Sequence, residues 1–195
     1  YKRQLKPMLA VFFVSTLMVR FPQDNPFKPS EARPEIWSYG HRNPQGMFYD
    51  EATKQLWSIE HGPRGGDEIN LIKKGANYGW AKVSHGKEYW GPLDVGEAKS
   101  LPGMEDPKLV YIPSIAPSNM ILYRGDKYPE LDGKILAGAL KLAHINVVSI
   151  ENGKLTESKR LVENLGERVR DITISPDGYI YFSTDSGKIF RLEEK

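Results

Sequence analysis

Short segments of apolar or alternating residues recur from residue 36 onward, and turn residues separate them. A period of two is typical of a β-strand with one buried face. We therefore expect strands at 46–49, 55–59, 68–72, 109–112, 120–123, 134–140, 145–150, 172–175, 179–184 and 188–192. The turns between them carry Gly, Asn and Asp in the combinations of tight hairpins, as at 151–153 and 176–178. Because helical periodicity is nearly absent, the sequence predicts an all-β fold.

A weak internal repeat narrows the choice among β architectures. A polar turn precedes a strand and a hairpin follows it at three places, 43–50, 116–123 and 170–177. The first interval is the longest because it carries a Gly- and Pro-rich insert at 84–107. Repeats of roughly 40–50 residues with about four strands each are typical of β-propeller blades. We expect about three blades, fewer than the roughly 4–8 of a closed propeller, so the chain is part of a propeller or a half that pairs with another piece.

The segment at 1–20 differs in composition from the rest of the chain. Lys2, Arg3 and Lys6 precede an apolar run that is too short to cross a bilayer as a helix. Basic residues followed by about 7–15 apolar ones match the first two parts of a secretory signal. The start of a fragment is the alternative interpretation, since no clear cleavage site follows and the first residue is Tyr1.

Four prolines lie between residues 21 and 35, where they disfavour regular strand pairing. We assign 21–35 to a linker and 36–195 to the partial propeller domain. The chain of 195 residues is 39% hydrophobic and 11% aromatic, which is enough to bury a core.

Charge and cysteine content exclude several classes of function. The net charge of +2 is the difference between 27 basic and 25 acidic residues that are interspersed along the chain. No basic stripe for nucleic acid follows from this distribution, and we expect no nucleic-acid partner. The absence of cysteine excludes disulfides, thiolate zinc sites and a cysteine nucleophile.

Two neighbouring motifs concentrate the polar chemistry of the chain. They are Gly-His-Arg-Asn-Pro-Gln-Gly at 40–46 and Glu-His-Gly-Pro-Arg-Gly-Gly-Asp-Glu-Ile-Asn at 60–70. Together they bring cationic donors, backbone carbonyls and carboxylates into a short stretch of sequence. This mixture suits an anionic ligand and a hard metal ion, and it does not suit a packed core.

Further blocks give these motifs a family context: Asn-Tyr-Gly-Trp at 77–80, Pro-Ser-Ile-Ala-Pro-Ser at 113–118, Ala-Leu-Lys at 139–141 and Arg-Val-Arg-Asp at 168–171. With all six blocks in this order, the chain resembles the C-terminal half of the soluble aldose sugar dehydrogenases, the glucose/sorbosone dehydrogenase family that depends on pyrroloquinoline quinone (PQQ). The resemblance implies a six-bladed propeller that holds PQQ and Ca²⁺ in its central cavity. It implies hydride transfer from the anomeric carbon of an aldose to the quinone, giving a lactone, with an external electron acceptor. It also implies a periplasmic or secreted location.

The carboxylates of PQQ require fixed cations, and guanidinium groups hold carboxylates well. The resemblance assigns this role to Lys141, Arg168 and Arg170. The two arginines alternate with Val169 on an expected strand, so both should face one side. Two solvated arginines on an outer face are the alternative.

Arg42 and Asn43 are expected in a loop before a strand, and the matching pair in the family lies near the reactive quinone carbonyls. Arg42 is therefore the catalytic candidate, because a cation there stabilises charge that develops on the quinone oxygen as hydride arrives. Asn43 also precedes a proline and suits a turn. Tyr89 matches a cofactor-contacting tyrosine, with a packing pair of Tyr89 and Trp90 as the alternative.

Calcium prefers several oxygen ligands, and a Gly-Pro peptide in a loop can present free carbonyls. By resemblance, Gly62 and Pro63 are the carbonyl ligands of the calcium ion that bridges to PQQ. Glu68 and Tyr78 match a further calcium site, Tyr78 through its backbone carbonyl. An exposed glutamate and a structural tyrosine would give the same sequence pattern.

The histidine that acts as general base in the family lies in the N-terminal half, and no block of this chain resembles it. His61 matches a position in the calcium loop, whereas His41, His85 and His144 are expected to be structural or surface residues. Since removing a general base costs a factor of about 10²–10⁴ in rate, we expect negligible dehydrogenase activity from this chain alone.

The alternative function is a non-catalytic propeller segment that binds a ligand or a partner. Exposed sheet edges in an incomplete propeller favour a homodimer or pairing with a missing propeller half.

Overall fold

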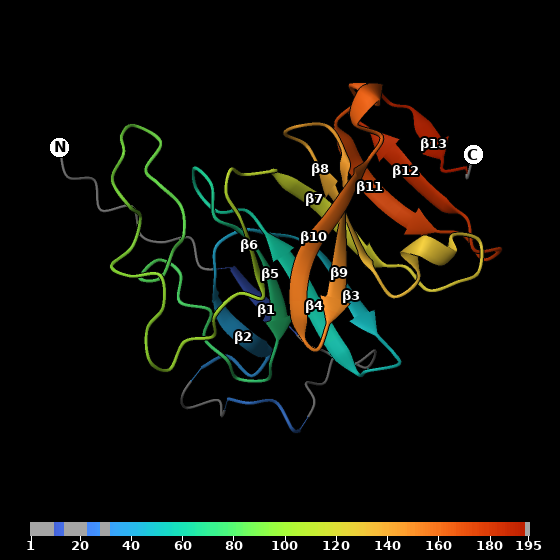
Figure 1. Ribbon diagram of the computed structural model, residues 1–195. Helices are drawn as coiled ribbons and strands as arrows, with labels where there is room; N and C mark the ends of the chain where they lie inside the picture. Colours follow the sequence, from blue (N-terminus) through green and yellow to red (C-terminus); the bar gives the residue numbers. More distant parts are fainter. Residues whose placement is uncertain (1–9, 14–22, 28–31, 194–195) are drawn as a thin grey trace.

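The computed structural model describes residues 10–13, 23–27 and 32–193 (Figure 1). Regular structure in these residues is β, apart from two short 3₁₀ turns, η1 (Pro129–Leu131) and η2 (Glu163–Leu165). The all-β prediction is confirmed. Among the described residues, no helix has the length and apolar character needed to cross a membrane.

Three antiparallel sheets lie side by side (Figure 1). The first contains β3 (Pro44–Asp50), β4 (Gln55–Glu60), β5 (Asp67–Ile72) and β6 (Leu109–Tyr111). The second contains β7 (Pro117–Leu122), β8 (Ile135–Ala139), β9 (Ile145–Glu151) and β10 (Lys154–Leu161). The third contains β11 (Val169–Ile174), β12 (Ile180–Thr184) and β13 (Ile189–Arg191). In each sheet, strands adjacent in sequence are adjacent in space, which is the order of a propeller blade.

The first strand of each blade lies on the inside of the assembly, since β7 contacts both β3 and β11. These three strands coincide with the three copies of the repeat, so the prediction of about three blades is confirmed. A separate two-stranded sheet pairs β1 (Ala10–Phe13) with β2 (Ile36–His41) in antiparallel fashion.

Two apolar cores separate the blades, and the middle blade contributes to both. Ala137 on β8 packs in the core between the first and second blades, next to Ile59 and Met120. Its neighbour Leu136 packs in the core between the second and third blades, next to Val169. Successive residues of a strand point to opposite faces, so a blade with two buried faces requires a continuous apolar run. This explains why all five residues of β8 are buried.

Each of the ten expected strands overlaps an observed one, but the sequence did not predict β1, β2 or β10. The hairpin turn before β10 was predicted, and Asn152 and Gly153 have the positive φ angles, 51° and 76°, of a tight turn. β10 was missed because it is the outermost strand of its blade. Only Leu155 among its residues is buried, so the apolar alternation that indicates a strand is nearly absent.

Little of the N-terminal region is described. Of the signal-like segment at 1–20, only Ala10–Phe13 lies within the described residues, as β1. Of the expected linker at 21–35, residues 23–27 and 32–35 are described and contain no strand. The insert at 84–107 has no strand either, and its loops extend to one side of the blades (Figure 1).

Candidate functional site

The candidate residues of the first blade gather where its innermost strand begins. Arg42 and Asn43 lie in the loop between β2 and β3, as expected. The register pairs Pro44, the first residue of β3, with Glu60, the last residue of β4. Gly62, which follows β4, therefore lies at the same end of the blade.

The candidate residues of the other two blades lie at the corresponding ends. Lys141 follows β8, whose last residue Ala139 pairs with Pro117 at the start of β7. The Nε2–H of His61 donates to the carbonyl of Pro117 at 2.6 Å, which links the first blade to the second. The hydroxyl of Ser118 donates to the carbonyl of Val169 at 2.8 Å, which links the second to the third. The three blade ends that carry the candidates thus adjoin one another.

Five of the predicted site residues line one small pocket in the first blade: Arg42, Gly62, Pro63, Glu68 and Tyr78. The free volume of this pocket is about 10 Å³. That is about the space of one water-sized particle, so the pocket has the size for a single ion.

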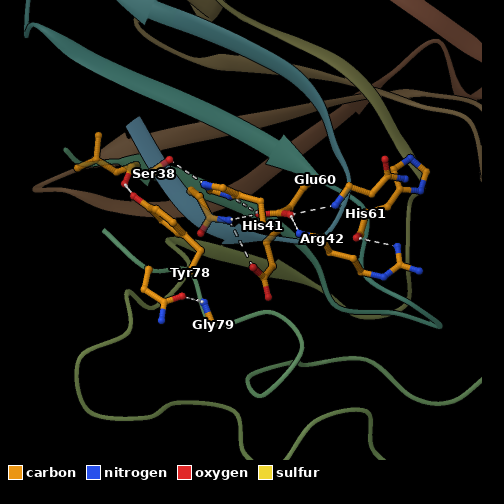
Figure 2. A network of polar contacts seen from close by, with 12 residues as sticks. Ser38, His41, Arg42, Glu60, His61, Tyr78 and Gly79 are labelled. Carbon is orange, nitrogen blue, oxygen red and sulfur yellow. Dashed lines mark hydrogen bonds and ion pairs between the residues drawn. The ribbon is translucent and has the colours of Figure 1, made fainter. Parts of the chain in front are cut away.

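Glu60 is the centre of a buried polar network beside this pocket (Figure 2). Its side chain is only 3% exposed. Oε2 accepts the backbone N–H groups of Arg42 and Asn43, at 2.7 and 3.2 Å. Oε1 accepts the side-chain amide of Asn70 at 2.9 Å and lies 3.2 Å from Nδ1 of His41. One buried carboxylate therefore joins β2, β4, β5 and the loop that carries Arg42.

His41 and Tyr78 support this network from the side of β2 (Figure 2). The His41 ring is fully buried, lies 2.9 Å from the Ser38 hydroxyl through Nε2, and stacks on Tyr78 with a centroid distance of 4.4 Å. The Tyr78 hydroxyl donates to the Leu71 carbonyl at 2.6 Å and accepts the Lys73 N–H at 2.8 Å. Burial raises the pKa of Tyr78 to about 12. Both rings are packing elements, in line with the structural role expected for His41.

The Arg42 side chain contacts the His61 carbonyl and the Trp80 ring. Its guanidinium donates to the His61 carbonyl at 3.1 Å and lies 5.2 Å from the centroid of the Trp80 ring. Its Nε is buried and has no hydrogen-bond partner among the described residues. A half-buried guanidinium at the wall of the pocket fits the binding of an anionic or carbonyl oxygen at this position.

Glu68 faces Glu60 across the β4–β5 pair, and one amide group, that of Asn70, donates to both carboxylates. Burial, together with the negative charge of Glu60, raises the pKa of Glu68 to about 8. Two neighbouring buried carboxylates need a cation or a proton to offset the cost of desolvation. No group of three or more acidic or histidine side chains in the described chain could hold a metal ion by itself. A cation at Glu68 would therefore use backbone carbonyls as further ligands, as hard cations commonly do.

Asp67 fixes the shape of the loop that carries Gly62, although the sequence did not single it out. The side chain is fully buried. Oδ1 accepts the Gly62 N–H at 3.0 Å, and Oδ2 accepts the Ser114 hydroxyl at 2.7 Å and the N–H groups of Ile115 and Ala116, each at 2.9 Å. The carboxylate therefore ties the Gly62 loop to the segment that leads into the second blade.

Gly62 has no room for a side chain. A Cβ atom at this position would lie 2.2 Å from the Gly66 carbonyl oxygen and 2.4 Å from that of Gly65, both on the backbone. Gly62→Ala should therefore lower the free energy of unfolding by about 1–3 kcal/mol, measured by urea denaturation. Gly91→Ala is the control, because nothing lies within 4 Å of its Cβ position, and a similar loss there would contradict the explanation.

The remaining cation candidates do not line the pocket. Arg168 and Arg170 both pair with Asp185, at 3.0 and 2.6 Å, while Val169 between them is buried. Both arginines thus reach Asp185, although Arg168 lies just before β11 and not on it; their role toward a cofactor stays a prediction. Lys141 is exposed at the adjoining end of the second blade.

The sequence left two interpretations for Tyr89 in the insert, a contact with the cofactor or a packing pair with Trp90. Tyr89 and Trp90 are 67% and 74% exposed, so the packing-pair alternative is wrong. The Tyr89 hydroxyl donates to the Pro63 carbonyl at 3.1 Å, which places this side chain at the edge of the pocket. Asn43 extends its side-chain oxygen to the amide of Gln45 at 2.8 Å, in a local turn.

Comparison with known proteins agrees with this fold. Residues 17–191 match the Glucose / Sorbosone dehydrogenase family. The aldose sugar dehydrogenase YliI of Escherichia coli is 45% identical over 179 residues, which cover 89% of this chain and 48% of the relative. The three blades and their polar loop ends are thus those of the sugar dehydrogenase propellers. The chain belongs to the glucose/sorbosone dehydrogenase family.

Solved structures give the same result. The crystal structure of the soluble aldose sugar dehydrogenase from Escherichia coli in the apo-form superposes with a TM-score of 0.83 at 44% identity, over 88% of this chain and 50% of that chain. The PQQ-bound form of an aldose sugar dehydrogenase from Streptomyces coelicolor shares the fold, with a TM-score of 0.68 at 23% identity, over 93% of this chain and 51% of that chain. The chain thus spans about half the length of the relatives that it matches.

Proposed function

We propose that this chain forms one half of the PQQ and calcium site of an aldose sugar dehydrogenase. The reaction is oxidation of the anomeric carbon of an aldose to the lactone, with an external electron acceptor. The observation that carries the proposal is that Arg42, Gly62, Pro63 and Glu68 line one ion-sized pocket.

The chemistry of this pocket fits a calcium ion. The pocket has room for one ion, which the Glu68 carboxylate and the backbone carbonyl of Tyr78 would hold. The carbonyls of Gly62 and Pro63 would hold a second ion outside this volume, on the side of PQQ. The raised pKa of Glu68 supports the ion at this carboxylate, because a carboxyl group that burial keeps protonated gains most when a cation replaces the proton.

The cationic residues of the blade ends fit the carboxylates and the quinone of PQQ, which accepts the hydride when it is bound. Arg42 would use its guanidinium to stabilise negative charge on a quinone oxygen, with Asn43 next to it in the loop and Tyr89 at the edge of the pocket. Arg168 and Arg170 would bind carboxylates in place of Asp185, and the exposed Lys141 would add a third cation.

A fluorescence titration with PQQ, with and without calcium, tests this proposal. We expect saturable, calcium-dependent quenching of the four tryptophans, and an affinity at least about tenfold weaker when Arg168 and Arg170 are both changed to alanine. Arg191→Ala is the matched control, since this arginine lies on β13, the outer strand of the third blade, and pairs with Glu193 just after it. A chain that is folded by circular dichroism and does not bind PQQ would overturn the proposal.

The general base and part of the substrate pocket would come from a second propeller half. Met47 and Tyr49 lie on β3, the innermost strand of the first blade, and are 52% and 50% exposed. Such apolar side chains on an inner strand support pairing with another half or with a second copy of the chain. A periplasmic or secreted location is part of this proposal and follows from the family.

A further inference from the structure

The loop that carries Arg42 and Asn43 depends on Glu60 for its conformation. The N–H groups of both residues donate to the same oxygen, Oε2 of Glu60, at 2.7 and 3.2 Å. Two successive N–H groups can converge on one acceptor only when the backbone between them turns toward it. The position of the acceptor therefore fixes the direction in which the Arg42 side chain leaves the loop.

The four acceptor sites of the Glu60 carboxylate are all in use. Oε2 receives the two backbone N–H groups, and Oε1 receives Asn70 and His41, at 2.9 and 3.2 Å. A carboxylate offers about four lone-pair sites, and its oxygens only accept, so His41 must carry its proton on Nδ1. Glu60 thus has no site left for a metal ion, whereas Glu68 accepts a hydrogen bond only from the Asn70 amide among the described residues.

We propose that Glu60 is a positioning residue, which holds the Arg42–Asn43 backbone so that the Arg42 guanidinium is aimed into the pocket. The inference rests on the proposed function, because the aim of Arg42 matters for an anionic quinone ligand. The two glutamates then have different roles: Glu60 orients the Arg42 guanidinium, and Glu68 binds calcium. Their positions on neighbouring strands, paired in register, explain why one pocket contains both.

Trp80 provides a readout of the aim of Arg42 that needs no cofactor. The guanidinium lies 5.2 Å from the centre of its ring and covers one face (Figure 2 shows Arg42 beside Glu60). If the loop loses its anchor, the guanidinium leaves this face and the ring becomes more accessible to a soluble quencher. Acrylamide quenching, with the signal of Trp80 isolated by comparison with Trp80→Phe, measures this change.

Three variants separate positioning from general stability. Glu60→Ala removes all four acceptor sites. Glu60→Gln keeps one acceptor oxygen for the two N–H groups, and a flipped Asn70 amide can pair with its NH₂ group, because Asn70 Oδ1 has no partner within the described part of the chain. Ser58→Ala is the control: Ser58 lies two residues earlier on the same face of β4, is fully buried, and its hydroxyl has no partner among the described residues.

We expect the accessibility of Trp80 to rise in Glu60→Ala, to rise less in Glu60→Gln, and to stay unchanged in Ser58→Ala. The dissociation constant for PQQ in the presence of calcium should rise about tenfold in Glu60→Ala and less in Glu60→Gln. If Glu60→Ala does not fold, Glu60→Gln carries the test through both measurements.

Two results would overturn the inference. The first is a folded Glu60 variant whose Trp80 accessibility equals that of the unchanged chain. The second is a loss of Ca²⁺ binding in Glu60→Gln, measured by calorimetry with calcium chloride, while Trp80 accessibility stays constant, because Glu60 would then be a metal ligand. Failure of the unchanged chain to bind PQQ would contradict the proposed function alone, since the Trp80 measurement is made without PQQ.

Discussion

Replacing Asp67 with alanine is expected to lower the free energy of unfolding by about 3–5 kcal/mol. The carboxylate is fully buried and accepts hydrogen bonds from four donors, three of them backbone N–H groups. Its removal leaves these donors buried without acceptors, and the loop of Gly62 loses its tie to the second blade. Urea denaturation followed by far-ultraviolet circular dichroism measures the loss.

Two further variants make this prediction specific. Asp67→Asn keeps the volume and one acceptor oxygen, so its loss should be about half as large. Asp126→Ala removes an exposed carboxylate and should change stability by no more than about 0.5 kcal/mol. A loss below about 1 kcal/mol for Asp67→Ala would show that solvent or a rearranged loop satisfies the donors.

The sequence was sufficient to predict most strands of the blades, because the pattern of apolar and polar residues within each strand indicates it. In β4, Trp57 and Ile59 face the second blade while Ser58 and Glu60 lie on the opposite face, so the period of two is visible without any knowledge of the fold. β10 lacks that signal, because an outermost strand exposes polar side chains on both faces. Its existence follows from pairing with β9, which is a tertiary contact.

In the candidate site, too, the sequence predicts features of neighbouring residues but not contacts between residues that are far apart in the chain. The alternation of Arg168 and Arg170 was enough to predict that they face one side, but their partner Asp185 comes from the next strand. Asp67 binds residues 47 to 49 positions further along the chain, and Glu60 binds a backbone 17 and 18 positions earlier. These two carboxylates act on backbone groups, which every residue has, so no sequence pattern identifies their partners.

Replacing Glu68 with glutamine should have opposite effects on stability with and without calcium. With a chelator at pH 9, we expect Glu68→Gln to be more stable than the unchanged chain by about 2–3 kcal/mol. Burial and the charge of Glu60 raise the pKa of Glu68 from 4.5 to about 8. Between these two pH values the unfolded chain loses the proton while the folded chain keeps it, so stability falls as the pH rises. Glutamine does not titrate and avoids this loss.

With saturating calcium the order should reverse, because only the unchanged chain offers a carboxylate to the ion. Ligand at about 1,000 times its dissociation constant stabilises a folded protein by about 4.1 kcal/mol, which exceeds the lead of the variant in chelator. Thermal unfolding with calcium chloride or chelator, at pH 5 and at pH 9, measures both effects. Glu151→Gln, an exposed glutamate at the end of β9, should follow the unchanged chain in every condition. Equal stabilisation of Glu68→Gln and the unchanged chain by calcium would show that Glu68 is not a ligand, and the raised pKa would then reflect burial beside Glu60 alone.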